Sequence, residues 1–359
     1  MHVYFLTWFS VFLLGLLAQQ VDYSWDEELT DSAVTHTSRA NLFFSVAVLI
    51  LVFVAGCRYY IGSDYYAYYG NYESYIKGFW EQLKILDEPG LPFIYWITSK
   101  FSYSGFACVF VSNAIMIILV LRTMYKNTDF LLFPLMLYSL VCWVATFNGM
   151  RQALATAVVF CGFPYLRDRK FIKYLIIIFL GFLCHKSALL MIPLYFLCHR
   201  KINIRNIVII IVVSFICLNS YELLFSVVES VLGKQLNTDG VYISKSVNSL
   251  RILTNIAPAL LFLLLNSRRE QNKLQDFYMN ILLFHAIVSF ISRDSAYLAR
   301  MVIFTAPFEV IAICELAKEK WNRNRSVITA LAIVLYFLFQ TYQIIISPDL
   351  SPFQWIWQR

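Results

Sequence analysis

The stretch NLFFSVAVLILVFVAGCRYYIGSDYYAYY, residues 41–69, joins a long apolar run to an abrupt polar exit. Residues 41–56 carry no charge, and the first charged residue after them is Arg58. Gly62 permits a turn, Asp64 follows it, and six tyrosines are interleaved. Such a run predicts a helix in a bilayer, and its exit places a cation, a carboxylate and amphipathic rings at the membrane edge. This combination suits a ligand of sugar size or one that carries phosphate.

The composition extends this prediction to the whole chain. The 359 residues are 60% hydrophobic and 14% charged, with a mean hydropathy of +0.64. Soluble domains are about 45–50% apolar and about 25% charged. We therefore expect an all-α polytopic membrane protein that forms one integral membrane domain over 1–359. The net charge of +7 does not indicate nucleic acid, because the basic residues lie at the ends of apolar runs.

The cysteines and the first apolar run add two further expectations. Eight cysteines lie in or next to apolar segments without any C-x-x-C pair, so we expect packing residues and neither a zinc site nor a disulfide framework. The run 3–18 has no basic residue before it and no small-residue cleavage site after it, so we expect a retained transmembrane helix.

About ten apolar segments approach the length of a membrane-crossing helix. We place them at 3–18, 41–57, 104–121, 130–146, 150–166, 206–220, 251–266, 277–292, 298–317 and 326–346. With ten crossings, more than half of the 29 basic residues gather on one side, which should be the cytoplasm. Both termini and two loops, 58–103 and 221–250, are then external. Within the first loop, residues 91–100 predict an interfacial helix.

The apolar segment 171–198 has basic flanks at both ends, so both ends are expected in the cytoplasm. Its 28 residues are too few for a return trip across the bilayer, which takes about 40. We therefore predict a helical hairpin that reaches deep into the membrane or crosses a thinned region. Its tip, His185-Lys186-Ser187, should face protein or water.

The predicted external side gathers the candidate site residues. Four arginines there, which the positive-inside rule should have depleted, suit the phosphates of a ligand because a guanidinium binds bidentately and stays charged. Asp64 or His185 can accept a proton from a hydroxyl. Tyr65, Glu88, Asn148 and Gln152 are candidates for contacts with a glycan, while His2, His36, His199 and His285 look incidental. The four candidate phosphate ligands are Arg58, Arg151, Arg251 and Arg300.

Several familiar motifs are absent from the sequence. It contains no Walker A loop, no G-x-G-x-x-G, no H-E-x-x-H and no D-x-D near the expected site. We therefore expect no cofactor and no metal, and not a nucleotide-sugar donor held by a divalent ion. A lipid-linked donor whose phosphate is neutralised by arginines fits better.

The order and spacing of five short motifs resemble those of the EpsG family, which are Wzy-type bacterial polysaccharide polymerases. The resemblance covers about residues 1–346 and departs from the family pattern at Lys186, where Pro or Ser commonly follows the histidine. The motifs are RYYIGSDY (58–65), EPG (88–90), NGMRQALA (148–155), HKSAL (185–189) and AR (299–300).

The resemblance implies a glycosyltransferase with a GT-C-like architecture in the bacterial cytoplasmic membrane. It implies undecaprenyl-pyrophosphate-linked oligosaccharides as substrates, with a flippase and a chain-length regulator as partners. A hydroxyl of one repeat unit attacks the anomeric carbon of another, and lipid pyrophosphate leaves. The arginines offset the charge of the leaving group, and Asp64 or His185 is the base. An O-antigen ligase, a lipid-linked oligosaccharide flippase or other transporter, and a structural or sensor protein stay open as alternatives.

Overall fold

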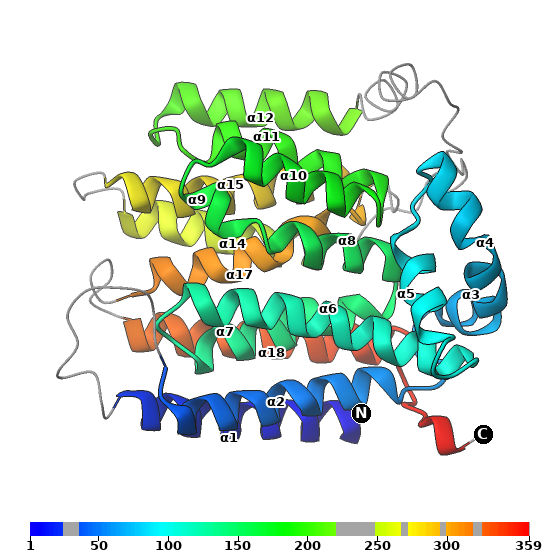
Figure 1. Ribbon diagram of the computed structural model, residues 1–359. Coiled ribbons are helices and arrows are strands. Elements are labelled where there is room, and N and C mark those ends of the chain that lie inside the picture. The colour runs from blue at the N-terminus through cyan, green and yellow to red at the C-terminus, as the bar shows by residue number, and fades with distance from the viewer. Residues whose placement is uncertain (24–35, 220–247, 267–271, 295–298, 319–324, 359) are drawn as a thin grey trace.

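The computed structural model describes residues 1–23, 36–219, 248–266, 272–294, 299–318 and 325–358. These ranges contain sixteen α-helices, joined by loops and by short π-helical and 3₁₀ segments (Figure 1). They are α1 His2–Tyr23, α2 Ser38–Gly56, α3 Tyr65–Gly70, α4 Tyr72–Ile85, α5 Gly90–Thr98, α6 Gly105–Asn127, α7 Leu132–Leu137, α8 Met150–Phe160, α9 Phe163–Arg167, α10 Phe171–Phe182, α11 Ile192–Leu197, α12 Ile204–Asn219, α14 Ser249–Asn266, α15 Lys273–Ile291, α17 Val302–Leu316 and α18 Arg325–Ile346.

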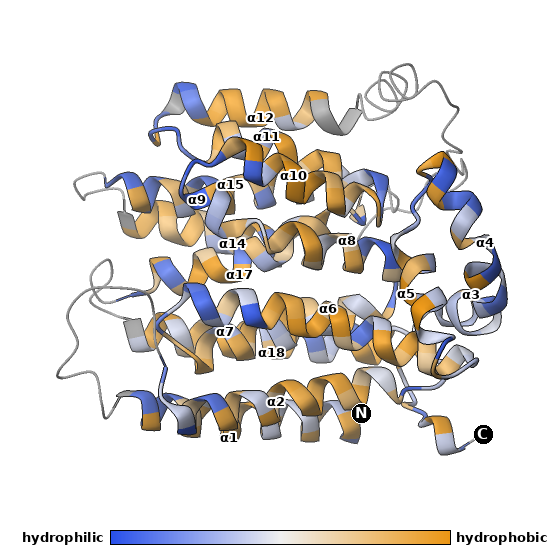
Figure 2. Ribbon diagram, viewed as in Figure 1, coloured by the Kyte–Doolittle hydropathy of each residue, from blue (hydrophilic) through white to orange (hydrophobic). Residues whose placement is uncertain are grey.

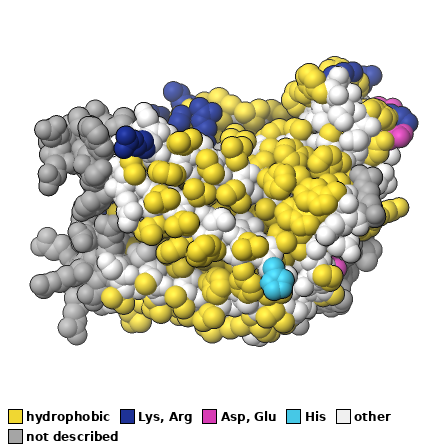
Figure 3. All heavy atoms as spheres, turned by 90° about the horizontal axis from the view of Figure 1, so that it is seen from below, with side chains coloured by type: hydrophobic (Ala, Val, Ile, Leu, Met, Phe, Trp, Pro, Cys, Tyr) yellow, Lys and Arg dark blue, Asp and Glu magenta, His cyan; other side chains and the backbone are white. Residues whose placement is uncertain are grey.

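Most of the long helices lie side by side along one direction, and apolar residues dominate them (Figures 1 and 2). Figure 3 shows a lateral face that is largely hydrophobic, with charged side chains at its margins. Five helices are long and apolar enough to cross a membrane, and six described apolar segments are shorter. The chain is therefore a multi-pass membrane protein. The five spans are His2–Asp22, Ser38–Gly56, Gly105–Asn127, Lys273–Ile291 and Ser326–Ile346.

Each of the ten predicted apolar segments coincides with a helical segment, but two of them are not single regular helices. The segment predicted at 130–146 consists of α7, the π-helix η1 (Tyr138–Trp143) and the 3₁₀ helix η2 (Val144–Phe147). The segment predicted at 150–166 divides into α8 and α9, because Pro164 in the first turn of α9 cannot continue a hydrogen-bonded helix. Ten crossings remain a prediction, and the loop 221–250 lies almost wholly outside the described residues.

The hairpin predicted at 171–198 is present as a helical hairpin. α10 forms its first arm, and the 3₁₀ helix η3 (Lys186–Met191) continues into α11 as the second. The arms are joined by the Tyr174 hydroxyl, which donates to the Met191 carbonyl at 3.0 Å. A Cβ at Gly181 would lie only 2.5 Å from Val159 Cγ2, so α10 packs closely against α8.

The two ends of the helical bundle differ. Both termini lie at the end that carries α3, α4 and α5, called here the α3–α5 end (Figure 1). α5 occupies most of the helix predicted at 91–100, whereas α3 and α4 were not predicted. Loops predicted to be cytoplasmic meet at the opposite end, where Arg167 Nη1 lies 3.3 Å from Asn127 Oδ1 and Lys318 Nζ 2.6 Å from Asp129 Oδ2.

A C-terminal strap, residues 347–358, returns to the opening stretch after α18. The amide of Tyr59 donates to the Gln354 carbonyl at 2.9 Å, and the Gly62 amide donates to the Asp349 carbonyl at 2.8 Å. The strap is thus hydrogen-bonded to the loop that follows α2, and it holds that loop at the α3–α5 end.

The close contact between α8 and α10 predicts that alanine lowers stability at Gly181 but not at Gly78, an open position on α4. Gly181→Ala places a methyl against the stiff Val159 side chain, and we expect a loss of about 1–3 kcal/mol of stability. Gly78→Ala in α4 meets only Gln82 Nε2 at 3.6 Å, so it should be neutral or gain up to about 1 kcal/mol in helix propensity. Thermal unfolding in detergent measures both, and equal Tm values would contradict close packing at Gly181.

Candidate functional site

Two turns from distant parts of the sequence meet at the α3–α5 end. Gly62 has a φ of +101°, and a Cβ there would lie 2.6 Å from the Phe147 carbonyl oxygen. Asp64 Oδ2 accepts the amide proton of Gly149, itself at a φ of +60°, over 2.9 Å. Asn148 Oδ1 lies 3.1 Å from the Ser63 hydroxyl, which donates to it. Both glycines adopt the conformation that favours glycine, so they fix Asp64 and Asn148 side by side.

Asp64 also links these turns to α17. Arg300, just before that helix, places Nη2 3.7 Å from Asp64 Oδ2. The Arg300 side chain is 38% exposed and that of Asp64 24% exposed, so both are accessible to a ligand. The structure therefore brings together two residues predicted for different roles, a phosphate ligand and a base.

Glu88 is the centre of a second polar group. Its Oε2 lies 2.9 Å from Arg151 Nη1, and its Oε1 accepts the backbone amide of Lys186 at 3.0 Å. Glu88 has a φ of +52°, a conformation that costs of order 1–3 kcal/mol outside glycine and that is offset here by these contacts. Glu88 thus joins the loop before α5 to α8 and to the hairpin tip, as expected if this tip faces protein.

The imidazole of His185 accepts a backbone hydrogen bond at one nitrogen and faces Glu88 with the other. Nδ1 accepts the Ser187 amide proton at 3.2 Å, so the ring proton of the neutral form lies on Nε2, 3.8 Å from Glu88 Oε1. The His185 side chain is only 14% exposed. Its one basic lone pair is occupied by the backbone, which makes His185 a poorer base than Asp64 in this arrangement.

Arg58 lies in the interior and is completely buried. Its Nε donates to the Ile61 carbonyl at 3.2 Å and its Nη2 to the Phe147 carbonyl at 3.4 Å, while Nη1 donates to the Ala55 carbonyl. Burial lowers the pKa of the Arg58 guanidinium to about 10, which leaves it charged at neutral pH. The structure thus gives Arg58 backbone partners and does not bring it to an open surface.

Tyr65 is buried beside Arg58, with its ring centroid 5.5 Å from the guanidinium carbon. No face of the Tyr65 ring is exposed, so this arrangement does not support its predicted role in glycan binding. Tyr60 and Tyr66 nearby are 48% and 63% exposed, so these two rings are the accessible part of the tyrosine cluster.

A cavity of about 350 Å³ opens beside Asp64 and Arg300. One wall, from η1, η2 and α17, is apolar and includes Val141, Val144 and Ile303. Four of the predicted site residues line it, namely Asn148, Gln152, Arg251 and Arg300. Arg151, Glu88 and His185 do not line this cavity and form the neighbouring group around Glu88.

A buried row of polar side chains that reaches the cavity was not predicted from the sequence. The Tyr336 hydroxyl donates to Glu309 Oε1 at 3.0 Å, and Glu309 Oε2 lies 3.0 Å from His285 Nε2. His285 Nδ1 lies 2.7 Å from Thr305 Oγ1. His285 therefore belongs to a polar network and is not incidental. The signal was available, because an ionisable residue inside an apolar segment, such as Glu309 in VIFTAPFEVIAICEL, marks a functional position by default.

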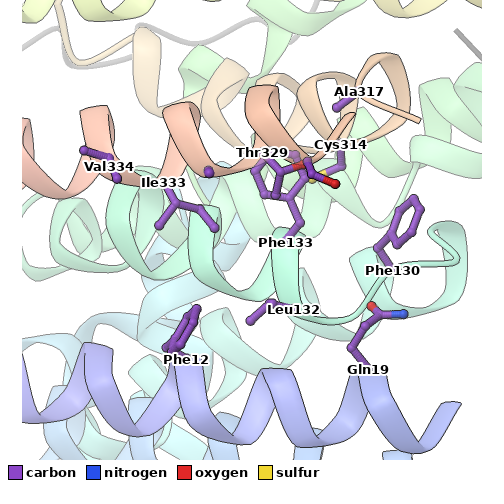
Figure 4. Close-up of a pocket in the computed structure, with 12 residues that line it drawn as sticks. Phe12, Gln19, Phe130, Leu132, Phe133, Cys314, Ala317, Thr329, Ile333 and Val334 are labelled. Atoms are coloured by element: carbon purple, nitrogen blue, oxygen red, sulfur yellow. The ribbon is translucent and has the colours of Figure 1, made fainter. Parts of the chain in front are cut away.

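A second cavity, of about 490 Å³, lies between α1, α7, α17 and α18. Phe12 on α1 and Ile333 on α18 approach it from opposite sides (Figure 4). Its described lining holds no charged residue, so it offers an apolar environment. In the described residues, no group of three or more His, Cys, Asp or Glu side chains is arranged to hold a metal ion.

Comparison with known families gives one match. A sequence model of the EpsG family matches residues 41–356. The chain belongs to the EpsG family. The match begins at the opening stretch and extends into the C-terminal strap, whereas the predicted resemblance covered 1–346. EpsG membership links this membrane protein to exopolysaccharide biosynthesis. No curated protein and no solved structure matches the chain.

The position of Arg58 predicts a structural effect for Arg58→Met. The variant keeps much of the volume but removes the donors of three carbonyls, each loss costing about 1–3 kcal/mol. We expect a large fall in Tm and little monodisperse protein in detergent. A variant that is as stable as the unmodified protein, yet inactive, would contradict this role and favour the predicted contact with pyrophosphate.

The group around Glu88 predicts a milder effect for Glu88→Gln. This change keeps one acceptor for the Lys186 amide but removes the charge that holds Arg151. Because Arg151 is 40% exposed, we expect a loss of about 1–2 kcal/mol, measured as a fall in Tm. Glu73→Gln, in an exposed pair with Lys77 on α4, is the matched control and should change Tm little. Equal effects of the two variants would contradict a central position for Glu88.

Proposed function

We propose that this protein is a polysaccharide polymerase that joins undecaprenyl-pyrophosphate-linked repeat units on the external face of the bacterial cytoplasmic membrane. The observation that carries the proposal is the cavity at the α3–α5 end, which holds two arginines beside an accessible carboxylate. Its EpsG membership and its multi-pass architecture support the same function. A flippase and a chain-length regulator are the partners that we propose with it.

Arg251 and Arg300 are the proposed ligands of the lipid pyrophosphate. Arg251 lies in the first turn of α14, and Arg300 lies two residues before α17 begins. Each helix N-terminus adds partial positive charge to that of the guanidinium. A pyrophosphate leaving group gains negative charge as its bond to the sugar breaks, so fixed positive charge here lowers the barrier.

Asp64 is the proposed base. The acceptor hydroxyl oxygen attacks the anomeric carbon, the bond from that carbon to the pyrophosphate oxygen breaks, and the hydroxyl proton passes to the Asp64 carboxylate. The 3.7 Å separation from Arg300 supports this role, because the reacting centre must lie next to the bound pyrophosphate. His185 is less suitable because the backbone occupies its basic nitrogen. Arg151, partly exposed in the neighbouring group, is proposed to contact the second lipid-linked unit.

One observation favours a second candidate function. His285 and Glu309 lie inside α15 and α17, and ionisable pairs within membrane helices are common in transporters. A transporter of lipid-linked oligosaccharides would move its substrate without lengthening it. Purified protein in lipid nanodiscs, supplied with lipid-linked repeat units, separates the two functions because only a polymerase makes longer chains.

The same assay tests the arginines. Removing one preorganised protein group that stabilises the charge of the leaving group lowers the rate about 10²–10³-fold. Arg251→Ala and Arg300→Ala should therefore each reduce the rate of polymer formation by about that factor. Arg122→Ala, an exposed arginine on α6, is the matched control and should leave the rate unchanged. Normal polymer lengths and rates in both cavity variants would overturn the proposal.

A further inference from the structure

The C-terminal half of the apolar helix α18 carries a row of polar residues along one face. Tyr336, Gln340 and Gln343 are spaced four and three residues apart, and Ser347 follows four residues later, so all four share one face. All four line the 350 Å³ cavity. Leu338 and Ile345, between them in sequence, are 58% and 65% exposed on the outer surface of the helix.

Two side-chain amide atoms at this cavity have no hydrogen-bond partner among the residues that the structure describes. They are Nε2 of Gln343, a donor, and Oε1 of Gln152, an acceptor on α8. Gln152 is 96% buried, since only 4% of its surface is exposed. Buried polar groups are nearly always paired, so this cavity is built for a ligand that can both donate and accept.

The unpaired acceptor distinguishes this part of the cavity from the arginine site. An ionised phosphate offers only acceptor oxygens, so it cannot pair with Gln152 Oε1. A sugar hydroxyl both donates and accepts, and it can pair with Gln152 as well as with Gln343. The apolar wall at Val144 and Ile303 suits the C–H faces of a sugar ring.

The buried row of polar side chains around Glu309 explains how this face of α18 is held toward the cavity. The Tyr336 hydroxyl is bound to Glu309 on α17, and Glu309 contacts His285 on α15. Only 22% of the most apolar 18-residue part of α18 is buried within the protein, so packing alone holds this helix weakly. The three side chains therefore fix the rotation of α18, and with it the direction of Gln340 and Gln343.

We propose that the polar face of α18, with Gln152 opposite, is the subsite that recognises the sugar attached to the lipid pyrophosphate and so determines which glycan is accepted. This inference rests on the proposed function. It assigns the arginines to the pyrophosphate and the amides to the sugar. Because the cavity is small for a ligand site, it takes the sugar next to the pyrophosphate and not a whole repeat unit.

A comparison of two lipids tests the subsite. The probes are undecaprenyl pyrophosphate without sugar and the lipid-linked oligosaccharide extracted from cells that lack this protein. Binding to the purified protein in nanodiscs is measured for both. Gln343→Leu and Gln340→Leu should each weaken binding of the oligosaccharide lipid about tenfold. Both variants should bind undecaprenyl pyrophosphate with an affinity within twofold of that of the unmodified protein. Leu338→Ala, on the outer surface of the same helix, should change neither.

The remaining outcomes separate the subsite from the function. If both glutamine variants bind the oligosaccharide lipid normally, the subsite is overturned and the polymerase proposal stands. If the unmodified protein binds neither lipid, the proposed function fails and the subsite fails with it. If Gln343→Leu binds neither lipid because it misfolds, the same comparison of the two lipids with Gln340→Leu tests the subsite. Arg300→Ala should weaken the binding of both lipids. This result would show that the assay detects contacts with the pyrophosphate separately from contacts with the sugar.

Discussion

The need to pair every buried backbone carbonyl constrains this structure most strongly, and Arg58 meets it for three carbonyls at once. Its guanidinium joins Ala55 at the end of α2, Ile61 in the following loop and Phe147 at the end of η2. Next to hydrocarbon, where water is excluded, an unpaired carbonyl is costly. The turn at Gly62 and the turn at Gly149 therefore stay in contact, and Asp64 keeps its place because they do.

Polar side chains divide into two layers by depth. Near the α3–α5 end, Asp64 and Glu88 bind arginines that remain partly exposed and can reach a ligand. Deeper, the His285 and Glu309 side chains lie 3.0 Å apart inside the helices. The outer layer has the exposure and charge that a phosphate site requires, and the buried inner layer can hold a binding wall in place.

Much of the fold could be predicted because length and hydropathy are local properties of the sequence. The apolar segments and the short hairpin follow from counting residues against the bilayer thickness. Short-range patterns do not reveal whether a polar side chain faces inward. Arg58 and Arg300 look alike as cations at span ends. Arg58, however, is buried against a carbonyl 89 residues away in sequence, whereas Arg300 is partly exposed. Glu309 was visible in the sequence as an ionisable residue in an apolar segment, but its partners, His285 and Tyr336, lie on other helices and could not be read from the local pattern.

The C-terminal strap has a practical consequence for topology mapping. Reporter proteins are often fused after successive membrane spans to decide which side each loop occupies. A fusion directly after α18 would omit residues 347–358, and with them the carbonyls that pair with the amides of Tyr59 and Gly62. Such a truncation would disturb the loop after α2, at the other end of the sequence, as well as the point of fusion. The reporter that tests the last span therefore belongs after residue 358, where the strap is kept.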